Sequence, residues 1–308
     1  MNTVGIVVSV IFIIALILYF IYFRVFGTRG HQESKYLYTT FTHDYTDEEK
    51  KTVKQTIAKG VEIPYETIEV LSNDNLVLRA RYYHVSTTSP TDIFVTGYNG
   101  LCRRDFAVLF QHSLNTLHHN VLLTSNRAHD ESTGHFCTFG KSESEDIIVW
   151  IGKIVEMMPQ SPINVIGFSL GASACILASP YMDSHVKKLV ADAPFSNGKD
   201  EMRYMLKKLF PKGGKILFPL VRFGTYVYGG FRLSKIDVVK AAQKCSVPVL
   251  LIHSKGDKMV PFEMGNEVYQ ALGENKQFLV LSENTGHGEG GIKEKDKYLS
   301  AITNFLEE

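Results

Sequence analysis

The sequence predicts an α/β protein whose mostly parallel sheet is covered by helices on both faces. Three observations predict this class. Short apolar runs rich in Val and Ile alternate with amphipathic segments from about residue 61 onward. One run ends in Gly167-Phe168-Ser169-Leu170-Gly171, which is followed by small residues typical of a helix. The first residues form a long apolar segment, which adds one N-terminal transmembrane helix to this architecture.

The N-terminal segment is predicted to cross a membrane. Residues 4–23 are 20 residues without a charge, and at about 1.5 Å per residue they cross a bilayer core of about 30 Å. A cleaved signal peptide is the alternative, but residues 1–3 carry no basic side chain and no small-x-small cleavage site follows. Arg24, Arg29 and Lys35 follow the span. The positive-inside rule therefore predicts a single-pass protein of the cell membrane with its domain on the cytoplasmic side.

These patterns divide the chain into three parts: a transmembrane helix (1–23), a juxtamembrane segment with an entry helix (24–60) and the α/β domain (61–308). Before the pentapeptide we expect a helix over 47–58, a hairpin over 67–85, a strand over 92–96, a helix over 106–117, a strand over 121–124 and a helix over 143–158. After it we expect strands over 188–191, 247–252 and 278–281, and a final helix over 293–306. The helix over 143–158 opens with Ser142 and Glu145 at capping-box spacing. Its apolar stripe, which includes Trp150, predicts core packing.

The pentapeptide has the form of a nucleophile elbow. A serine between two glycines at a strand-to-helix turn lies in a turn so tight that larger flanking side chains would clash, and its hydroxyl projects from the sheet edge. The apolar run that precedes Ser169 and the small residues that follow it provide the strand and the helix that this motif needs. Ser169 is therefore the candidate nucleophile.

An elbow serine needs a histidine base that is oriented by an acid, and the three follow in the chain order Ser, Asp, His. Only His185, His253 and His287 lie after Ser169. His185 falls in a polar turn, and His253 ends an apolar run, where a structural role is expected. His287 lies in a loop after the strand predicted over 278–281, and Asp257 lies in the loop after the preceding strand. Ser169, Asp257 and His287 are the predicted catalytic residues.

Further motifs identify a family resemblance over about three quarters of the chain. They are Gly97-Tyr98-Asn99-Gly100, the segment 126–134, the elbow, Asp192-Ala193-Pro194, Gly256-Asp257, Val260-Pro261 and Gly286-His287. With these the chain resembles the α/β-hydrolases, and is most similar to their lysophospholipase-like and serine-aminopeptidase-like group, which includes members with an N-terminal membrane anchor. It departs from that group at Thr96, where His is usual, at Ser125, where Asp is usual, and at Asp130, where Gly is usual.

The resemblance also implies an oxyanion hole. In α/β-hydrolases the tetrahedral oxyanion receives one backbone N–H from the residue after the nucleophile and one from the loop after an earlier strand. These positions match Leu170 and Tyr98 in this sequence. Both donors belong to the main chain, so the identity of the side chain matters little there.

An insertion over 195–235 falls where α/β-hydrolases commonly place a cap. It carries nine Lys and Arg residues against Asp200 and Glu201, interleaved with eight Phe and Tyr residues. Basic and aromatic side chains together suit an anionic membrane surface, so we expect contact with membrane lipids. The alternative is a helical lid whose apolar face covers the site and whose lysines are solvated; the two interpretations are compatible.

Composition excludes other classes of function. The 33 basic and 32 acidic residues leave no charge excess for nucleic-acid binding. The four cysteines have no metal-ligand spacing and are interpreted as free thiols, and no phosphate-binding loop or dinucleotide fingerprint is present. We therefore expect no cofactor and no metal, as serine-triad chemistry requires none.

The sequence thus predicts a membrane-tethered serine hydrolase that cleaves carboxylic esters, short-acyl or lipid-like, through an acyl-enzyme. A serine peptidase that releases small N-terminal residues is the enzymatic alternative. It would need an acid to hold the substrate ammonium, for which Asp130, Glu131 and Glu289 are candidates. A catalytically silent membrane scaffold is the alternative outside enzymology.

Overall fold

One eight-stranded sheet organises the domain in the computed structural model, which describes residues 3–28 and 45–308. The strands lie in the order β1-β2-β4-β3-β5-β6-β7-β8. Their bounds are β1 (Glu66–Leu71), β2 (Val77–Tyr83), β3 (Thr91–Val95), β4 (Asn120–Thr124), β5 (Ile163–Phe168), β6 (Val186–Asp192), β7 (Val249–Ser254) and β8 (Lys276–Leu281). β1 and β2 pair antiparallel, β2 joins β4 antiparallel, and the strands from β4 to β8 are parallel.

The central strands are buried on both faces because side chains alternate across a sheet. In β3, Ile93 and Val95 face one core cluster while Phe94 faces the other. In β5, Val165 and Ile166 divide in the same way. This double burial explains the consecutive apolar residues within the central strands, at 93–95, 121–123 and 165–166.

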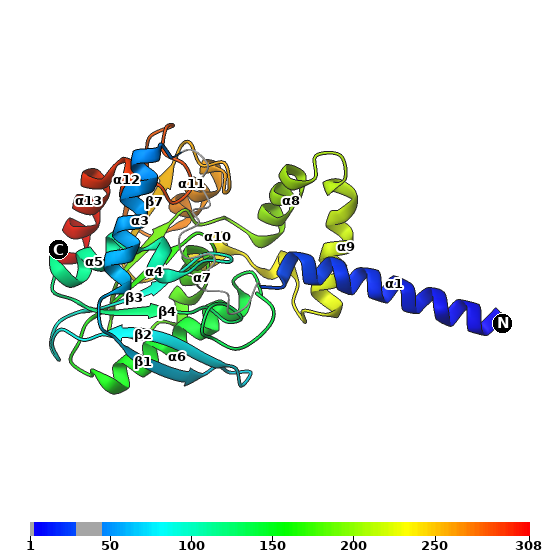
Figure 1. The fold of residues 1–308 in the computed structure, drawn as a ribbon, viewed down its shortest axis with the longest axis horizontal. Helices are drawn as coiled ribbons and strands as arrows, with labels where there is room; N and C mark the ends of the chain where they lie inside the picture. Colours follow the sequence, from blue (N-terminus) through cyan, green and yellow to red (C-terminus); the bar gives the residue numbers. More distant parts are fainter. Residues whose placement is uncertain (1–2, 29–44) are drawn as a thin grey trace.

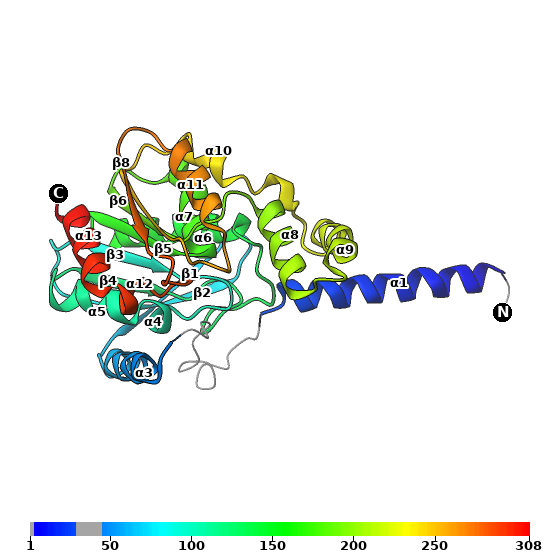
Figure 2. The ribbon, with the colours of Figure 1, turned by 90° about the horizontal axis from the view of Figure 1, so that it is seen from above.

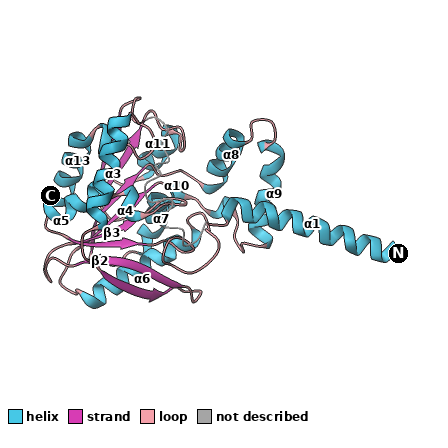
Figure 3. Cartoon of the chain, in the orientation of Figure 1, coloured by secondary structure: helices cyan, strands magenta, loops and turns pink. Residues whose placement is uncertain are grey.

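Helices cover both faces (Figure 1). One face carries α6 (Lys141–Met157), α7 (Leu170–Ala178), α10 (Val238–Ala242) and α11 (Phe262–Ala271). The other carries α4 (Cys102–Asp105), α5 (Ala107–Asn115), α13 (Lys295–Glu307) and, packed outside α5, α3 (Asp47–Val61). The short helices are α12 (Gly290–Lys293) and the 3-10 turns η1 (Ser179–Tyr181) and η2 (Leu233–Lys235). The predicted α/β class with helices on both faces is confirmed, as the cartoon in Figure 3 also shows.

The capping box predicted for the helix over 143–158, which is α6 in the structure, is wrong. α6 begins at Lys141, so Ser142 lies inside the helix instead of capping it. The carboxylate of Glu143 accepts hydrogen bonds from the backbone N–H groups of Gly140 (2.8 Å) and Thr138 (2.8 Å). The hydroxyl oxygen of Thr138 in turn accepts from the N–H of Ser142 at 2.8 Å. The cap is formed two residues earlier than the spacing of Ser142 and Glu145 predicts.

Two helices between β6 and α10 lie outside the alternation of strands and helices: α8 (Gly198–Leu209) and α9 (Gly214–Val227). Together with η2 they project from the body on the side from which the N-terminal helix extends (Figures 1 and 2). We refer to residues 195–235 as the cap. Asn197 caps α8 by accepting from the N–H of Asp200 at 2.8 Å.

The N-terminal helix, α1 (Thr3–Phe26), is long and apolar enough over Gly5–Phe26 to cross a membrane. Its final turns are part of the domain core, since Tyr22 and Phe26 are buried among aromatic side chains of the body and the cap. Gly27 forms a β-bridge with Phe136 immediately afterwards. Of the charges that predict the orientation, Arg29 and Lys35 lie outside the described residues.

Candidate active site

The elbow is built as its sequence predicts. Ser169 has φ 56° and ψ −120°, between the end of β5 and the start of α7. A Cβ at Gly167 would lie 2.7 Å from the Cα of Ala172, and one at Gly171 would lie 2.1 Å from the carbonyl oxygen of Val95. Neither position has room for a side chain. The N–H of Ser169 donates to the carbonyl of Asp192 at 2.7 Å, which fixes the turn against the neighbouring strand.

The connections after β5, β7 and β8 meet at the carboxyl edge of the parallel strands. Ser169 follows β5, Asp257 follows β7 and His287 follows β8, and the structure brings these three side chains together. His287 Nδ1 lies 2.6 Å from Asp257 Oδ2, and His287 Nε2 lies 2.9 Å from Ser169 Oγ. Because Nδ1 faces a carboxylate, it carries the proton, and Nε2 accepts from the serine hydroxyl.

Backbone donors and a second histidine fix the Asp257 loop. Asp257 Oδ1 accepts from the N–H groups of Met259 (2.7 Å) and Val260 (2.9 Å), which leaves Oδ2 for His287. His253 lies fully buried, with Nε2 3.1 Å from the carbonyl oxygen of Val260 and 3.6 Å from Asp257 Oδ2. Burial lowers the pKa of His253, so it is a neutral donor to the loop, consistent with its expected structural role.

Close contacts between loops position His287. A Cβ at Gly256 would lie 2.1 Å from the carbonyl oxygen of Glu283, so the Asp257 and His287 loops touch through their backbones. Gly288 has φ +71°, and a Cβ there would lie 2.6 Å from the ring of Phe168. That ring also packs on the imidazole of His287, with centroids 4.8 Å apart. The backbone contact at Gly256 and the ring of Phe168 therefore restrict the imidazole of His287 to one orientation.

Asp257 and His287 shift each other's pKa in opposite directions. Burial alone would lower the pKa of His287, but the Asp257 carboxylate outweighs it, and the pKa is raised above its usual 6.5. Burial alone would raise the pKa of Asp257, but His287 and the backbone donors lower it overall. The acid therefore stays ionised and favours a protonated imidazole, as a general base that takes a proton during a reaction requires.

The loop after β3 lies against the serine. A Cβ at Gly97 would be 3.1 Å from Ser169 Cβ and 3.5 Å from Ser169 Oγ, so the next residue, Tyr98, begins beside Ser169. The hydroxyl of Tyr98 points elsewhere and donates to the carbonyl of Val25 at 2.6 Å. Leu170 is the first residue of α7, where the N–H groups have no acceptor within the helix. These are the two positions predicted to supply the oxyanion donors.

Two of the departures from the family pattern contact each other. The hydroxyl of Ser125 donates to Asp130 Oδ2 at 3.3 Å, and Arg103 reaches Asp130 Oδ1 at 3.3 Å. The pair thus belongs to the framework of the loop over 125–134.

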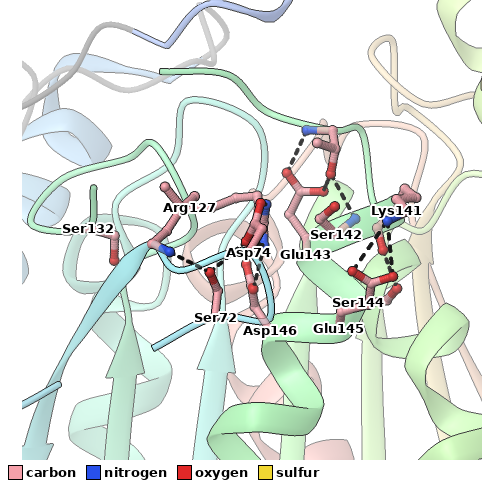
Figure 4. A network of polar contacts seen from close by, with 12 residues as sticks. Ser72, Asp74, Arg127, Ser132, Lys141, Ser142, Glu143, Ser144, Glu145 and Asp146 are labelled. Carbon is pink, nitrogen blue, oxygen red and sulfur yellow. Dashed lines mark hydrogen bonds and ion pairs between the residues drawn. The ribbon is translucent and has the colours of Figure 1, made fainter. Parts of the chain in front are cut away.

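Arg127 anchors the same loop (Figure 4). Its guanidinium donates two 2.7 Å hydrogen bonds to Asp146 of α6 and further bonds of 2.8 Å and 3.1 Å to Asp74 of the β1–β2 turn. Asp146 is buried and Asp74 is largely exposed. Arg127 therefore ties three separate segments together below the site.

Two buried acids, Asp192 and Glu201, lie beside the site although the sequence did not predict them as site residues. Asp192 ends β6 and accepts from the hydroxyl of Tyr298 at 2.9 Å, and burial raises its pKa to about 7. Asp192 and Tyr298 line a cavity of about 100 Å³ next to His287. Glu201, in the first turn of α8, is only 2% exposed, and burial raises its pKa to about 8. Among the residues that the structure describes, Glu201 Oε2 has no hydrogen-bond partner.

The cap brings Glu201 to the site. Tyr204 donates its hydroxyl to the carbonyl of Lys258 at 3.1 Å, and Lys208 donates to the same oxygen. Glu201, Tyr204 and Lys208 share one face of α8 because residues spaced by three or four positions do so. That face lies over the Asp257 loop. The spacing is visible in the sequence, but a charge on an amphipathic helix normally indicates a solvated side chain.

The three acids considered for binding a substrate ammonium all have internal partners. Glu131 pairs with Arg81 at 2.5 Å, Asp130 with Arg103 at 3.3 Å, and Glu289 with Lys293 at 2.7 Å. Over residues 3–28 and 45–308, no group of three His, Cys, Asp or Glu side chains is arranged to hold a metal ion.

The sheet order, the elbow and the loops at the carboxyl edge are those of the α/β-hydrolase fold. The family model for the alpha/beta hydrolase fold matches residues 93–218. Among curated proteins, the chain is 24% identical over 283 residues to the uncharacterized protein YqkD of Bacillus subtilis (strain 168), covering 87% of this chain and 91% of YqkD. It is 24% identical over 250 residues to the lysophosphatidylserine lipase ABHD12 of Danio rerio, covering 74% of this chain and 61% of the lipase.

A solved structure with the same fold is the Pyrococcus furiosus esterase Pf2001. Its TM-score is 0.64 at 23% identity, with 81% of this chain and 92% of the esterase covered.

Proposed function

We propose that this protein is a membrane-anchored serine hydrolase that cleaves carboxylic esters, short-acyl or lipid-like, through an acyl-enzyme. The observation that carries the proposal is the hydrogen-bonded line from Ser169 Oγ to His287 (2.9 Å) and from His287 to Asp257 (2.6 Å). A serine hydroxyl, a base and an acid in this order are what nucleophilic acyl transfer needs.

In this mechanism Ser169 Oγ attacks the ester carbonyl carbon while His287 Nε2 takes its proton. Asp257 holds the imidazole and stabilises its positive charge. The tetrahedral oxyanion accepts hydrogen bonds from the backbone N–H groups of Leu170 and Tyr98. Collapse expels the alcohol, which receives the proton from His287. Water, activated by His287, then attacks the acyl-enzyme and releases the carboxylic acid and Ser169.

Three observations support the membrane anchor and the lipid-like substrate class. Residues 5–26 are long and apolar enough to span a bilayer. Cleavage as a signal peptide would remove Tyr22 and Phe26 from the domain core. Two similar proteins carry the names esterase and lysophosphatidylserine lipase. From the charge flank we propose that the domain lies on the cytoplasmic side. Protease treatment of intact cells tests this, and digestion of the domain from outside would contradict it.

Fluorophosphonate labelling tests the proposed nucleophile. We expect the wild-type chain to be labelled, Ser169→Ala to lose all label, and Ser234→Ala, which removes an exposed serine of the cap, to keep it. A correctly folded wild-type protein that takes no label would support the silent scaffold instead.

A serine aminopeptidase is the second candidate, and Glu201 is the observation that favours it. A buried acid beside Asp257 and His287, without a hydrogen-bond partner for Oε2 in the described chain, is suited to a substrate ammonium. Hydrolysis of p-nitrophenyl esters and aminoacyl anilides separates the two activities. We expect ester preference, and Glu201→Gln should leave KM for a neutral ester nearly unchanged. Preference for the anilide, with KM raised in Glu201→Gln, would select the peptidase.

A further inference from the structure

The cap crosses the N-terminal helix within its apolar length. α9 contacts α1, and the hydroxyl of Tyr228 donates to the carbonyl of Ala15 at 2.7 Å. The rings of Tyr19 and Tyr228 meet edge-to-face at 5.4 Å, and Gly224 lies against Tyr22. Figure 1 shows α9 running across α1, and Figure 2, turned by 90°, shows α9 nearly end-on. α9 is therefore transverse to the helix that would span the bilayer.

This position conflicts with a membrane that stops at the end of α1. The apolar span Gly5–Phe26 has 22 residues, about 33 Å of helix, against a bilayer core of about 30 Å. The contact at Ala15 lies eleven residues before Phe26, which is about 16 Å along the axis. The backbone of α9 at Gly224 lies against Leu18 and Tyr22. If α9 stayed in water, residues 5–17 of α1 would span only about 20 Å of the core.

The outer face of α9 is suited to lipid. Its buried stripe, Phe218, Val221 and Gly224 with Thr225, packs inward. A second stripe at the same helical spacing is exposed and also apolar: Ile216, Leu220, Phe223 and Val227. Ile216 is 72% exposed and Phe223 is 52% exposed. The end of α8 adds the exposed side chains of Leu209 and Phe210. Contiguous exposed apolar surface of this kind marks an interaction site.

Cationic groups flank this stripe. A groove of about 460 Å³ is lined by Pro219, Arg222, Phe223, Tyr226, Arg232 and Ser234. The guanidinium of Arg232 lies 4.9 Å from the centre of the Tyr226 ring. Arginine beside aromatic rings at the edge of an apolar face is the arrangement found where a helix lies at the phosphate level of a leaflet.

We propose that α9 lies within the membrane leaflet nearest the α/β domain. Its exposed side chains Ile216, Leu220, Phe223 and Val227 lie among the acyl chains, and Arg222 and Arg232 lie at the lipid phosphates. This inference rests on the proposed anchoring by α1 and adds that the cap enters the bilayer. Because α8 joins α9 to the Asp257 loop, the cap then links the leaflet directly to the site, which is suited to substrates that arrive from the membrane.

Tryptophan quenching by lipids brominated on the upper acyl chain tests the proposal with the full chain in vesicles of phosphatidylcholine and phosphatidylglycerol. Phe223→Trp reports α9, and Phe12→Trp reports the exposed part of α1. Val85→Trp is the control. Val85 follows β2, which runs antiparallel to β4, so Val85 lies at the amino ends of the parallel strands. The native Trp150 is buried and gives a common background.

We expect the emission added by Phe223→Trp and by Phe12→Trp to be mostly lost in brominated vesicles, and that of Val85→Trp to be unchanged. Quenching of Phe12→Trp alone would overturn the insertion of α9 while leaving the anchor intact. Absence of quenching at both positions would overturn the anchor and, with it, this inference. Quenching of Val85→Trp to the same extent would mean that the probe reports unfolding on the vesicle, and would also count against the proposal.

Discussion

Glu201→Gln should make the stability of the domain less dependent on pH. In the folded protein this carboxyl is 2% exposed, and burial raises its pKa from 4.5 to about 8, with His287 lowering it and Asp257 raising it to smaller extents. In the unfolded chain the same group titrates near its ordinary value. Between these two values the unfolded state has released the proton and the folded state has kept it. The free energy of unfolding therefore falls as pH rises through this window.

The size of the effect follows from the shift. Each pKa unit corresponds to about 1.4 kcal/mol. Part of the loss has already occurred at pH 5, and about half of the folded carboxyls are ionised at pH 8. Between these pH values the wild-type protein should lose about 3 to 4 kcal/mol through Glu201 alone. Asp192 adds a similar loss, but it is present in both proteins and cancels in the comparison.

Trp150 provides the assay, because it is the chain's single tryptophan and is 2% exposed. Denaturant unfolding of the full chain in detergent is followed by its fluorescence at pH 5 and pH 8. The amide of Glu201→Gln has a stability cost of its own, but this is the same at both pH values. Relative to wild type, the variant should gain about 3 kcal/mol from pH 5 to pH 8, whereas Glu267→Gln, an exposed acid of α11, should gain nothing. An identical pH dependence of wild type and Glu201→Gln would refute the reasoning.

Three further results are expected. The raised pKa of His287 should put the acid limb of kcat/KM above pH 6.5, and Asp257→Asn should move this limb to lower pH and reduce kcat on the order of 10⁴-fold, measured with a p-nitrophenyl ester. Arg127→Met should destabilise the domain by about 3 to 5 kcal/mol in the same unfolding assay, because it leaves the buried carboxylate of α6 unpaired. Gly171→Ala should prevent folding of the elbow, since its Cβ would lie 2.1 Å from a carbonyl oxygen, whereas Gly152→Ala, which meets nothing within 4 Å in α6, should stabilise by about 0.5 to 1 kcal/mol.

The fold and the three site residues were accessible from sequence because both depend on local patterns. The strands are buried on both faces and therefore read as apolar runs, and the order of the strand-end loops follows from parallel topology. The loops that hold Asp257 and His287 are identifiable for this reason. The expected bounds differ from the observed ones by one to three residues for most elements, as for α3 (Asp47–Val61) and β3 (Thr91–Val95).

What the sequence could not predict depends on contacts between distant segments. The start of α6 is decided by Glu143, which binds the N–H groups before the helix, while Ser142 and Glu145 match the capping pattern equally well. Glu201 is buried only because α8 folds over another loop. The hydrogen bond from Tyr228 to Ala15 joins positions 213 residues apart. No periodicity reports such a contact.

The union of α1 with the body also limits how the enzyme can move. Thr28 donates its N–H to His135 at 3.1 Å, and Cys137 donates to the carbonyl of Phe26 at 2.9 Å. These backbone hydrogen bonds fasten the end of α1 to the loop over 135–137. An enzyme attached to a membrane by a flexible linker can rotate freely relative to the bilayer. With α1 anchored as proposed, the burial of Tyr22 and Phe26 in the core would hold the Ser169 site at a constant height and tilt relative to the lipid.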